Sequence, residues 1–176
     1  MLTPENFLDQ QPQFHLDESG QPISWAIGSD VLRFIGGFLN PGARTLETGS
    51  GVSTVYLTLL GCEHIAISPD AREFRRISLF CEKHGVSLDS VSLIEGRSEL
   101  KLPRMDLAPL DLVLIDGRHG FPSPFIDWFF SAISLKVSGY MVVDDVQLLT
   151  GKILQEFLAE DSHWRTVEVF PKTAVF

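Results

Sequence analysis

Acidic side chains and glycines that could bind a nucleotide-like ligand follow two short apolar segments. The segment RTLE (44–47) leads into a turn made of Thr48, Gly49, Ser50, Gly51, Val52 and Ser53. Two glycines one residue apart let a backbone turn tightly and approach a ligand at the start of a helix, although a plain strand-to-helix turn is the alternative. A second acid, Asp70, follows the segment HIAIS (64–68). It could accept hydrogen bonds from a ribose diol or stabilise the first turn of a helix, and both roles are compatible.

Three further carboxylates end two other apolar segments. Asp116 ends DLVLID (111–116), and Asp144 and Asp145 end GYMVVDD (139–145). Like charges raise one another's pKa, so we expect a bound cation or a nearby arginine to relieve the repulsion. The alternative is that one acid caps a helix while the others are solvated. We favour a functional site.

One histidine and one serine complete the set of candidate residues. His119 lies three residues beyond Asp116 in the glycine-flanked loop DGRHGF. Histidine titrates closest to neutral pH among the side chains, so His119 could act as a general base, or it could be an exposed loop residue. Ser98, after the segment SVSLIE (90–95), could border an adenine or belong to an ordinary surface turn.

Strand-like and helix-like segments alternate along the chain and would position these residues. The predicted strands are 44–47, 64–68, 90–95, 111–116 and 139–145, followed by a hairpin of RTVEVF (165–170) and KTAVF (172–176). The predicted helices are 29–38, 53–60, one with Ser68 as N-cap and Pro69 as its first residue that ends at Gly85, 123–135 and 150–159. Nearly uninterrupted apolar strands joined by helices predict a doubly wound α/β fold with a parallel sheet. Ligands bind at the carboxyl ends of such strands.

Composition predicts one domain of an ordinary kind. The chain has 176 residues, 44% of them hydrophobic, and we assign residues 25–176 to a single domain and 1–24 to an irregular leader. Net charge −9 disfavours binding to nucleic acid or anionic lipid. Cys62 and Cys81 show no metal-ligand spacing, which predicts buried thiols in a reducing cytoplasm. We expect neither a signal peptide nor a membrane span.

The chain resembles the class I S-adenosylmethionine-dependent methyltransferases over residues 25–176. The motifs that carry the resemblance are ETGSGVST, ISPD, LIDGRHGF and GYMVVDD, in the family's order. Within that family the chain is most similar to the catechol O-methyltransferase-like enzymes, which act on small molecules. The resemblance implies a Rossmann-like, seven-stranded, mostly parallel sheet whose last strand, in the C-terminal hairpin, is antiparallel.

The resemblance also implies roles for the candidate residues. The implied S-adenosylmethionine-binding residues are Glu47, Thr48, Gly49, Ser50, Gly51, Ser53, Asp70, Ser98 and Asp116, with Glu47, Gly49 and Gly51 at the methionine portion, Asp70 at the ribose and Ser98 at the adenine. The implied ligands of Mg²⁺ or another divalent cation are Asp116, Asp144 and Asp145, the last of which replaces an Asn of that subgroup. His119 stands at the position of the subgroup's catalytic lysine, so His119 and Asp116 are the implied catalytic residues.

The predicted function is therefore methyl transfer from S-adenosylmethionine to a small-molecule hydroxyl. The main alternative is a non-catalytic S-adenosylmethionine-binding or interaction domain, because the lysine is replaced and the subgroup's N-terminal helical lid is largely missing. A nicotinamide oxidoreductase is disfavoured because Thr54 stands at the third glycine position of that fingerprint. A metal-dependent hydrolase would leave ETGSGVST unexplained. Exposed aromatic residues near the active edge predict a homodimer.

Overall fold

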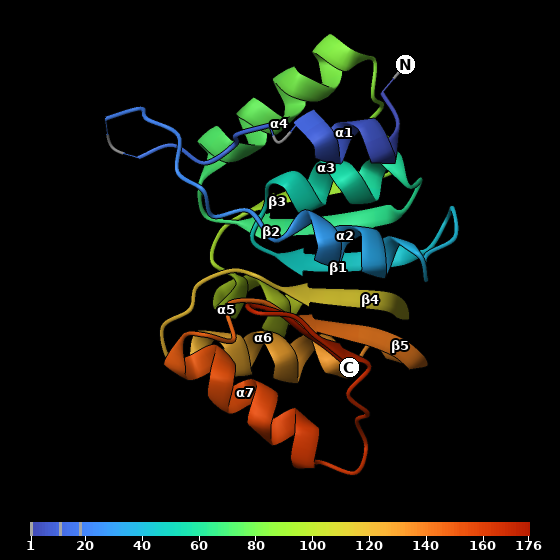
Figure 1. Ribbon diagram of the computed structural model, residues 1–176, viewed down its shortest axis with the longest axis vertical. Helices are drawn as coiled ribbons and strands as arrows, with labels where there is room; N and C mark the ends of the chain where they lie inside the picture. The colour runs from blue at the N-terminus through green and yellow to red at the C-terminus, as the bar shows by residue number, and fades with distance from the viewer. Residues whose placement is uncertain (1, 11, 18) are drawn as a thin grey trace.

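A seven-stranded sheet runs through the middle of the protein in the order β3-β2-β1-β4-β5-β7-β6. The computed structural model describes residues 2–10, 12–17 and 19–176 (Figure 1). The strands are β1 (Arg44–Thr48), β2 (Glu63–Ser68), β3 (Val91–Glu95), β4 (Leu110–Ile115), β5 (Leu135–Val143), β6 (Glu168–Val169) and β7 (Ala174–Val175). Strands β1 to β5 run parallel to one another, and β7 is antiparallel to both β5 and β6. The predicted Rossmann-like sheet with an antiparallel C-terminal hairpin is confirmed.

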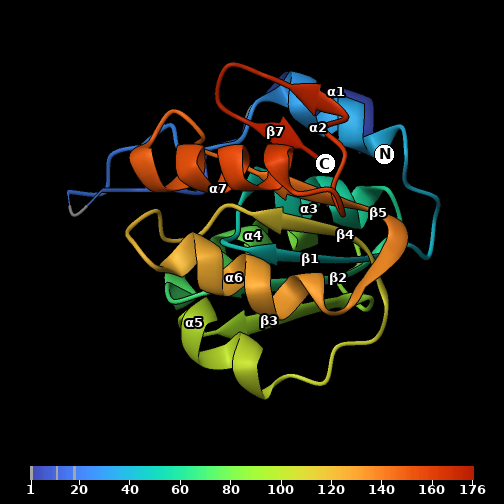
Figure 2. The ribbon, with the colours of Figure 1, turned by 90° about the horizontal axis from the view of Figure 1, so that it is seen from below.

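Helices cover both faces of the sheet (Figures 1 and 2). The helices are α1 (Pro4–Gln10), α2 (Ser29–Gly36), α3 (Val52–Leu59), α4 (Ala71–His84), α5 (Ser98–Lys101), α6 (Ser123–Ala132) and α7 (Leu149–Glu160), with a 3₁₀ turn at Leu102–Arg104. Within the described ranges, none of these helices has both the length and the apolar content that a membrane crossing needs.

The core is divided by the sheet into two apolar layers. Successive strand residues point to opposite faces, so Leu112 and Leu114 of β4 pack beneath α1 to α4, while Val113 and Ile115 pack against α6 and α7. All four side chains are at most 3% exposed. This two-sided burial explains why the strands read as continuous apolar runs rather than as alternating patterns.

The expectation of an irregular leader over residues 1–24 is wrong for α1. Phe7 and Leu8 of this helix, together with Phe14 beyond it, are buried in the layer of α2 to α4. The Phe7 ring meets the Phe80 ring of α4 edge-on, with centroids 5.7 Å apart. The segment was predicted to be irregular because its composition is polar on average. Burial of its few apolar residues stabilises α1, a helix too short to form alone.

Three element boundaries also differ from the sequence prediction. The N-cap of α4 is Asp70 rather than Ser68, because the Asp70 carboxylate accepts the backbone N–H of Arg72. Helix α6 ends at Ala132, and β5 already begins at Leu135, which pairs with Leu110 before the register shifts. Helix α5 was not predicted.

Both cysteines are unpaired and buried, as predicted. Burial raises the pKa of the Cys62 thiol and of the Cys81 thiol to about 11. Thiols with a raised pKa are poor nucleophiles and poor metal ligands, so these two residues belong to the packing of the core.

Candidate active site

A cavity of about 850 Å³ opens at the carboxyl ends of the parallel strands. The strand order reverses between β1 and β4, and ligands of doubly wound sheets bind at such a reversal. The predicted site residues that line the cavity are Gly49, Ser50, Asp70, Ser98, Asp116, His119, Asp144 and Asp145. They come from the ends of β1 to β5, so parallel strands bring together side chains that lie up to 96 positions apart in the sequence (145 − 49).

The turn after β1 is shaped by Gly49. Its φ is +106°, a conformation that favours glycine, and its N–H donates to the Ile67 carbonyl at 2.8 Å. A Cβ at this position would lie 2.3 Å from the Asp116 carbonyl oxygen, so no side chain fits without displacing the end of β4. The turn and the end of β4 therefore pack directly against each other at the floor of the cavity.

The Glu47 side chain does not reach the cavity, which corrects the expectation that it contacts the cofactor directly. Glu47 is 1% exposed, and its Oε1 lies 3.2 Å from His64 Nε2. The same oxygen accepts a hydrogen bond from the Thr54 hydroxyl, which in turn accepts the Gly51 N–H at 2.9 Å. Through Thr54, Glu47 therefore supports the glycine turn from inside the protein rather than from the cavity. The sequence placed the acid correctly in the chain but not the direction of its carboxylate.

Three other predicted residues also lie outside the cavity lining. Thr48 and Ser53 are buried, at 0% and 3% exposure, and Gly51 faces His15 instead. The Thr48 side chain follows the alternation of β1 into the protein, and Ser53 belongs to α3, which is buried along most of its length. These residues build the turn rather than the wall of the site.

Asp70 and Glu73 follow β2, and Asp70 has an arginine partner at the surface. The Asp70 carboxylate accepts hydrogen bonds from the Arg72 backbone and guanidinium groups, and these bonds hold the pKa of Asp70 below its usual value. Both roles weighed from the sequence stay open for Asp70, since it caps α4 and also lines the cavity.

Glu73, which the sequence reasoning missed, points inward from the first turn of α4. Its carboxylate accepts the hydroxyls of Ser50 and Ser68 at 2.9 Å each and pairs with His15 Nδ1 at 2.8 Å. Burial acts to raise the pKa of Glu73, but these hydrogen bonds and the His15 charge outweigh it and lower the pKa. The spacing Asp70-x-x-Glu73 matches a capping box, which marks the start of a helix. The sequence pattern therefore did not indicate that the Glu73 carboxylate points inward.

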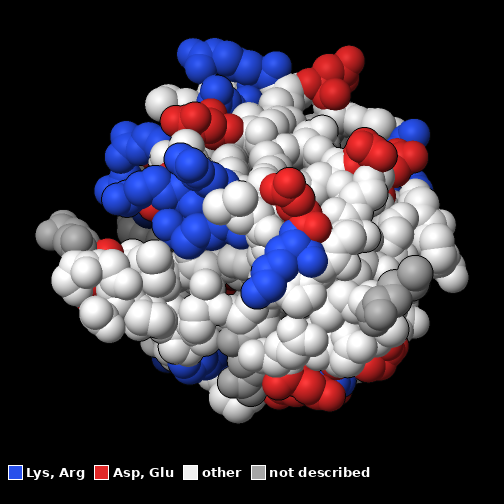
Figure 3. All heavy atoms as spheres, turned by 90° about the horizontal axis from the view of Figure 1, so that it is seen from above, with Lys and Arg blue, Asp and Glu red and all other residues white. Residues whose placement is uncertain are grey.

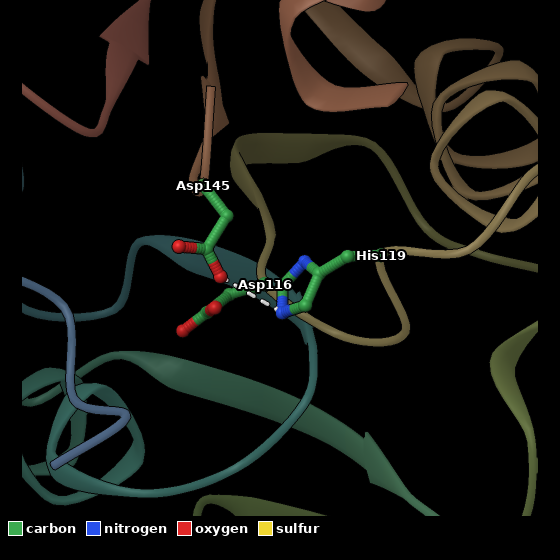
Figure 4. A group of neighbouring side chains, drawn as sticks. All are labelled: Asp116, His119 and Asp145. Atoms are coloured by element: carbon green, nitrogen blue, oxygen red, sulfur yellow. Dashed lines mark ion pairs between the residues drawn. The ribbon is translucent and has the colours of Figure 1, made fainter. Parts of the chain in front are cut away.

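Asp116, His119 and Asp145 form a cluster on the other side of the cavity (Figure 4). His119 Nε2 lies 2.8 Å from Asp145 Oδ2, and one ligand atom from each of the three residues lies within 4.8 Å of the others. Burial raises the pKa of Asp116 well above its usual value, and the nearby carboxylates of Asp144 and Glu47 raise it further. Burial and the neighbouring carboxylates therefore favour the protonated form of Asp116.

Asp144 lies next to this cluster, close enough to Asp116 to raise its pKa. Its carboxylate accepts a hydrogen bond from the Thr173 hydroxyl, and its pKa is raised mainly by burial. Asp145 adopts a positive φ of 54°, which turns its side chain toward His119. Asp116, His119 and Asp145 therefore share one cluster, and Asp144 borders it next to Asp116.

The remaining wall comes from the N-terminal segment. Trp25 lines the cavity although its side chain is 63% exposed, and its neighbours from Ser24 to Gly28 line it as well. Phe121, in the loop before α6, is 79% exposed and lies outside the lining.

Comparison with known proteins supports the fold. No protein-family model matches the chain, and no curated protein sequence matches it. Many solved structures do match. The O-methyltransferase TomG from Streptomyces achromogenes, involved in tomaymycin synthesis and solved with S-adenosylmethionine, superposes with a TM-score of 0.74 at 20% identity, over 96% of this chain and 87% of TomG.

Two further matches act on different acceptors according to their names. A precorrin-6Y C5,15-methyltransferase from Geobacter metallireducens has a TM-score of 0.64 at 24% identity, over 84% of this chain and 78% of that one. An rRNA methylase from Streptococcus thermophilus has a TM-score of 0.61 at 13% identity, over 84% and 93%. This protein therefore has the fold of the class I S-adenosylmethionine-dependent methyltransferases. The fold alone does not select the acceptor.

Proposed function

We propose that this protein is an S-adenosylmethionine-dependent methyltransferase that methylates a hydroxyl group of a small molecule. The observation that supports it is the joint placement, around one cavity at the strand reversal, of the Gly49–Ser50 turn, the Ser98 loop and the His119–Asp145 pair. The first two suit the cofactor and the third suits proton removal from an acceptor. A binding domain without catalysis would not need the third.

The chain's own residues have two tasks in this reaction. When bound, the cofactor supplies an electrophilic methyl group, so the protein must align the acceptor oxygen and remove its proton. His119 is the base that accepts this proton. Asp145, paired with His119 Nε2, orients the ring and stabilises the imidazolium that forms. Asp116 adds a second carboxyl group beside the acceptor.

The same cluster also fits a divalent cation. Two carboxylates and one imidazole lie within bonding range of a common point, and a cation would relieve the charge that raises the pKa of Asp116. An imidazole in this ligand set favours Mn²⁺, Fe²⁺ or Zn²⁺ over Mg²⁺, which prefers oxygen ligands only. Such a cation would lower the pKa of a bound hydroxyl group, and His119 would then be a ligand rather than the base.

Isothermal titration calorimetry with S-adenosylmethionine and S-adenosylhomocysteine tests the cofactor assignment, and repeating it with Mg²⁺ and Mn²⁺ tests the cation. We expect binding of both ligands without added metal. Release of S-adenosylhomocysteine in the presence of a panel of hydroxylated aromatic compounds then tests turnover. Cofactor binding without turnover of any acceptor would favour the non-catalytic alternative, and absence of binding by folded protein would overturn the proposal.

A small-molecule acceptor, rather than a nucleic acid, is supported by the net charge of −9. Lys and Arg do gather on part of the face that carries α4 (Figure 3), where Arg72 and Arg75 are exposed. Acidic residues lie among them, and Arg72 is already paired with Asp70. A short RNA duplex that fails to bind at about 0.1 M salt, where the Debye length is about 10 Å, would agree with this choice of acceptor.

A homodimer through α6 and α7 forms part of the proposal. The exposed apolar residues of this face are Phe129 on α6, Ile133 directly after it, and Leu149, Ile153 and Phe157 on α7. The residues of α7 repeat every four positions, and Lys152 and Glu156 flank them. Antiparallel packing of two α7 helices about Ile153 would pair these opposite charges between copies. Light scattering should report a dimer that Ile153→Asp converts to a monomer.

A cytoplasmic location is supported by the two unpaired thiols.

A further inference from the structure

Residues 12–17 and 19–28 form a strap that follows α1 and leads into α2 (Figure 1), and His15 of this strap lines the cavity. The strap folds back on itself, since Leu16 and Pro22 form an antiparallel bridge and the Ile23 N–H donates to the His15 carbonyl at 3.0 Å. Its last residues, Ser24 to Gly28, line the cavity directly. The strap is therefore a structured part of the wall.

The strap is anchored to α4 by Phe14, the residue before His15. Phe14 is 3% exposed, and its ring meets the Phe80 ring edge-on at 5.4 Å. The Phe14 carbonyl accepts a hydrogen bond from the Arg76 guanidinium. These contacts fix the backbone immediately before His15, so the position of its ring does not depend on the ion pair with Glu73 alone.

His15 itself stands between the strap, α4 and the glycine turn. Its side chain is only 12% exposed, and its Nδ1 is 2.8 Å from Glu73 Oε1. Its Nε2 would lie 2.8 Å from a Cβ built on Gly51, so the ring packs closely over the turn that leads into α3. Trp25 lies on another side, with ring centroids 5.9 Å apart.

This arrangement leaves one nitrogen of the ring for a ligand. Nδ1 is taken by Glu73, and the other Glu73 oxygen is taken by Ser50 and Ser68. Nε2 has no protein partner at hydrogen-bond distance among the interactions of the described residues, and His15 lines the cavity. When both ring nitrogens carry a proton, Nδ1–H donates to Glu73 and Nε2–H is a donor suited to an anionic oxygen.

We propose that His15 binds the carboxylate of the cofactor's methionine portion, so that the strap supplies a direct cofactor contact. The inference rests on the proposed function. The methionine portion is chosen because Nε2 lies beside Gly51, the N-cap of α3, and the start of this helix also favours negative charge. Glu73 acts as a positioning residue that holds the ring in this orientation.

Two ligands that differ only by the amino-acid portion test the proposal. S-Adenosylhomocysteine carries the carboxylate, whereas 5′-methylthioadenosine has the same adenosine and thioether but no amino-acid portion. We expect His15→Ala to weaken S-adenosylhomocysteine binding about tenfold, the typical effect of losing one charge-assisted hydrogen bond, with 5′-methylthioadenosine binding unchanged. His15→Gln, which keeps a donor, should recover part of the affinity.

His163→Ala is the matched control, because His163 is also paired with an acid at 2.8 Å but is 88% exposed and remote from the cavity lining. It should leave both affinities unchanged. Equal losses of both ligands in His15→Ala would indicate a general loosening of the strap and overturn the carboxylate contact, as would no loss of either. Wild-type protein that binds neither ligand would overturn the proposed function and this inference with it.

Discussion

Replacing Gly49 by alanine should weaken cofactor binding about tenfold or more while leaving the protein folded. The new Cβ meets the Asp116 carbonyl oxygen at 2.3 Å, and the φ of +106° disfavours any side chain. Strain of this kind costs about 1–3 kcal/mol, and relief of the clash must move either the turn or the end of β4. Both border the cavity, so the displacement falls on the site itself.

Gly42 offers a control that separates strain from the clash. Its φ is +83°, but a Cβ there has no atom within 4 Å, and Gly42 lies outside the cavity lining. Gly42→Ala should lower the melting temperature by about 2–8 °C, as expected for 1–2 kcal/mol in a chain of this size, with unchanged S-adenosylhomocysteine affinity. Gly49→Ala should lower the melting temperature at least as much and weaken S-adenosylhomocysteine binding by about tenfold or more.

Calorimetric titration and thermal unfolding of the two variants beside wild type provide the comparison. Wild-type affinity in Gly49→Ala would refute the claim that the cofactor rests on this turn. Equal loss of affinity in Gly42→Ala would refute the local argument, because strain far from the cavity would then be sufficient.

Three further predictions concern the charged residues of the site. His119→Ala should keep S-adenosylhomocysteine affinity and lower turnover about 10²- to 10⁴-fold, and unchanged turnover would exclude His119 as base or ligand. Since the pKa of Glu73 is lowered in the folded state, its carboxylate stabilises the fold above the pKa of unfolded glutamate, and this contribution is lost as pH falls through the folded pKa. Urea unfolding should therefore show Glu73→Gln less stable than wild type at about pH 7 and equal to it near pH 3; the same difference at both pH values would contradict this. Because the pKa of Asp116 is raised in the folded state, ionisation of this carboxyl destabilises the fold as pH rises. The Asp116→Asn variant should therefore have a higher melting temperature than wild type at neutral pH. A lower melting temperature would contradict this.

Local signals in the sequence were sufficient to place the elements that carry the site. The apolar runs at 44–47, 64–68 and 111–116 match β1, β2 and β4 to within one residue at each end. Such runs are read correctly because a strand buried on both faces needs apolar residues at every position. The glycine turn after β1 was found for the same kind of reason, since a tight turn limits which residues can occupy it.

The ends of strands and helices and the directions of side chains were harder to predict from the sequence. β5 starts at Leu135 because its pairing with Leu110 adds residues ahead of the apolar run, and this pairing has no signal in the run itself. Glu47 sits at the predicted position, but its carboxylate turns to His64, a partner on the neighbouring strand. Pairing between strands depends on contacts across the sheet, which residue types along one strand do not specify.

By itself, the sequence determined the order of strands and helices, the glycine turn and the acids that end β4 and β5, because these follow from periodicity and from the conformational limits of single residues. Only the tertiary structure decided which side chains meet. Asp116, His119 and Asp145 meet in one cluster, and burial of Phe14 accompanies the contact of His15 with Glu73 across 58 positions of sequence. Both outcomes depend on packing between segments distant in the chain, and that packing is set by the whole fold rather than by neighbouring residues.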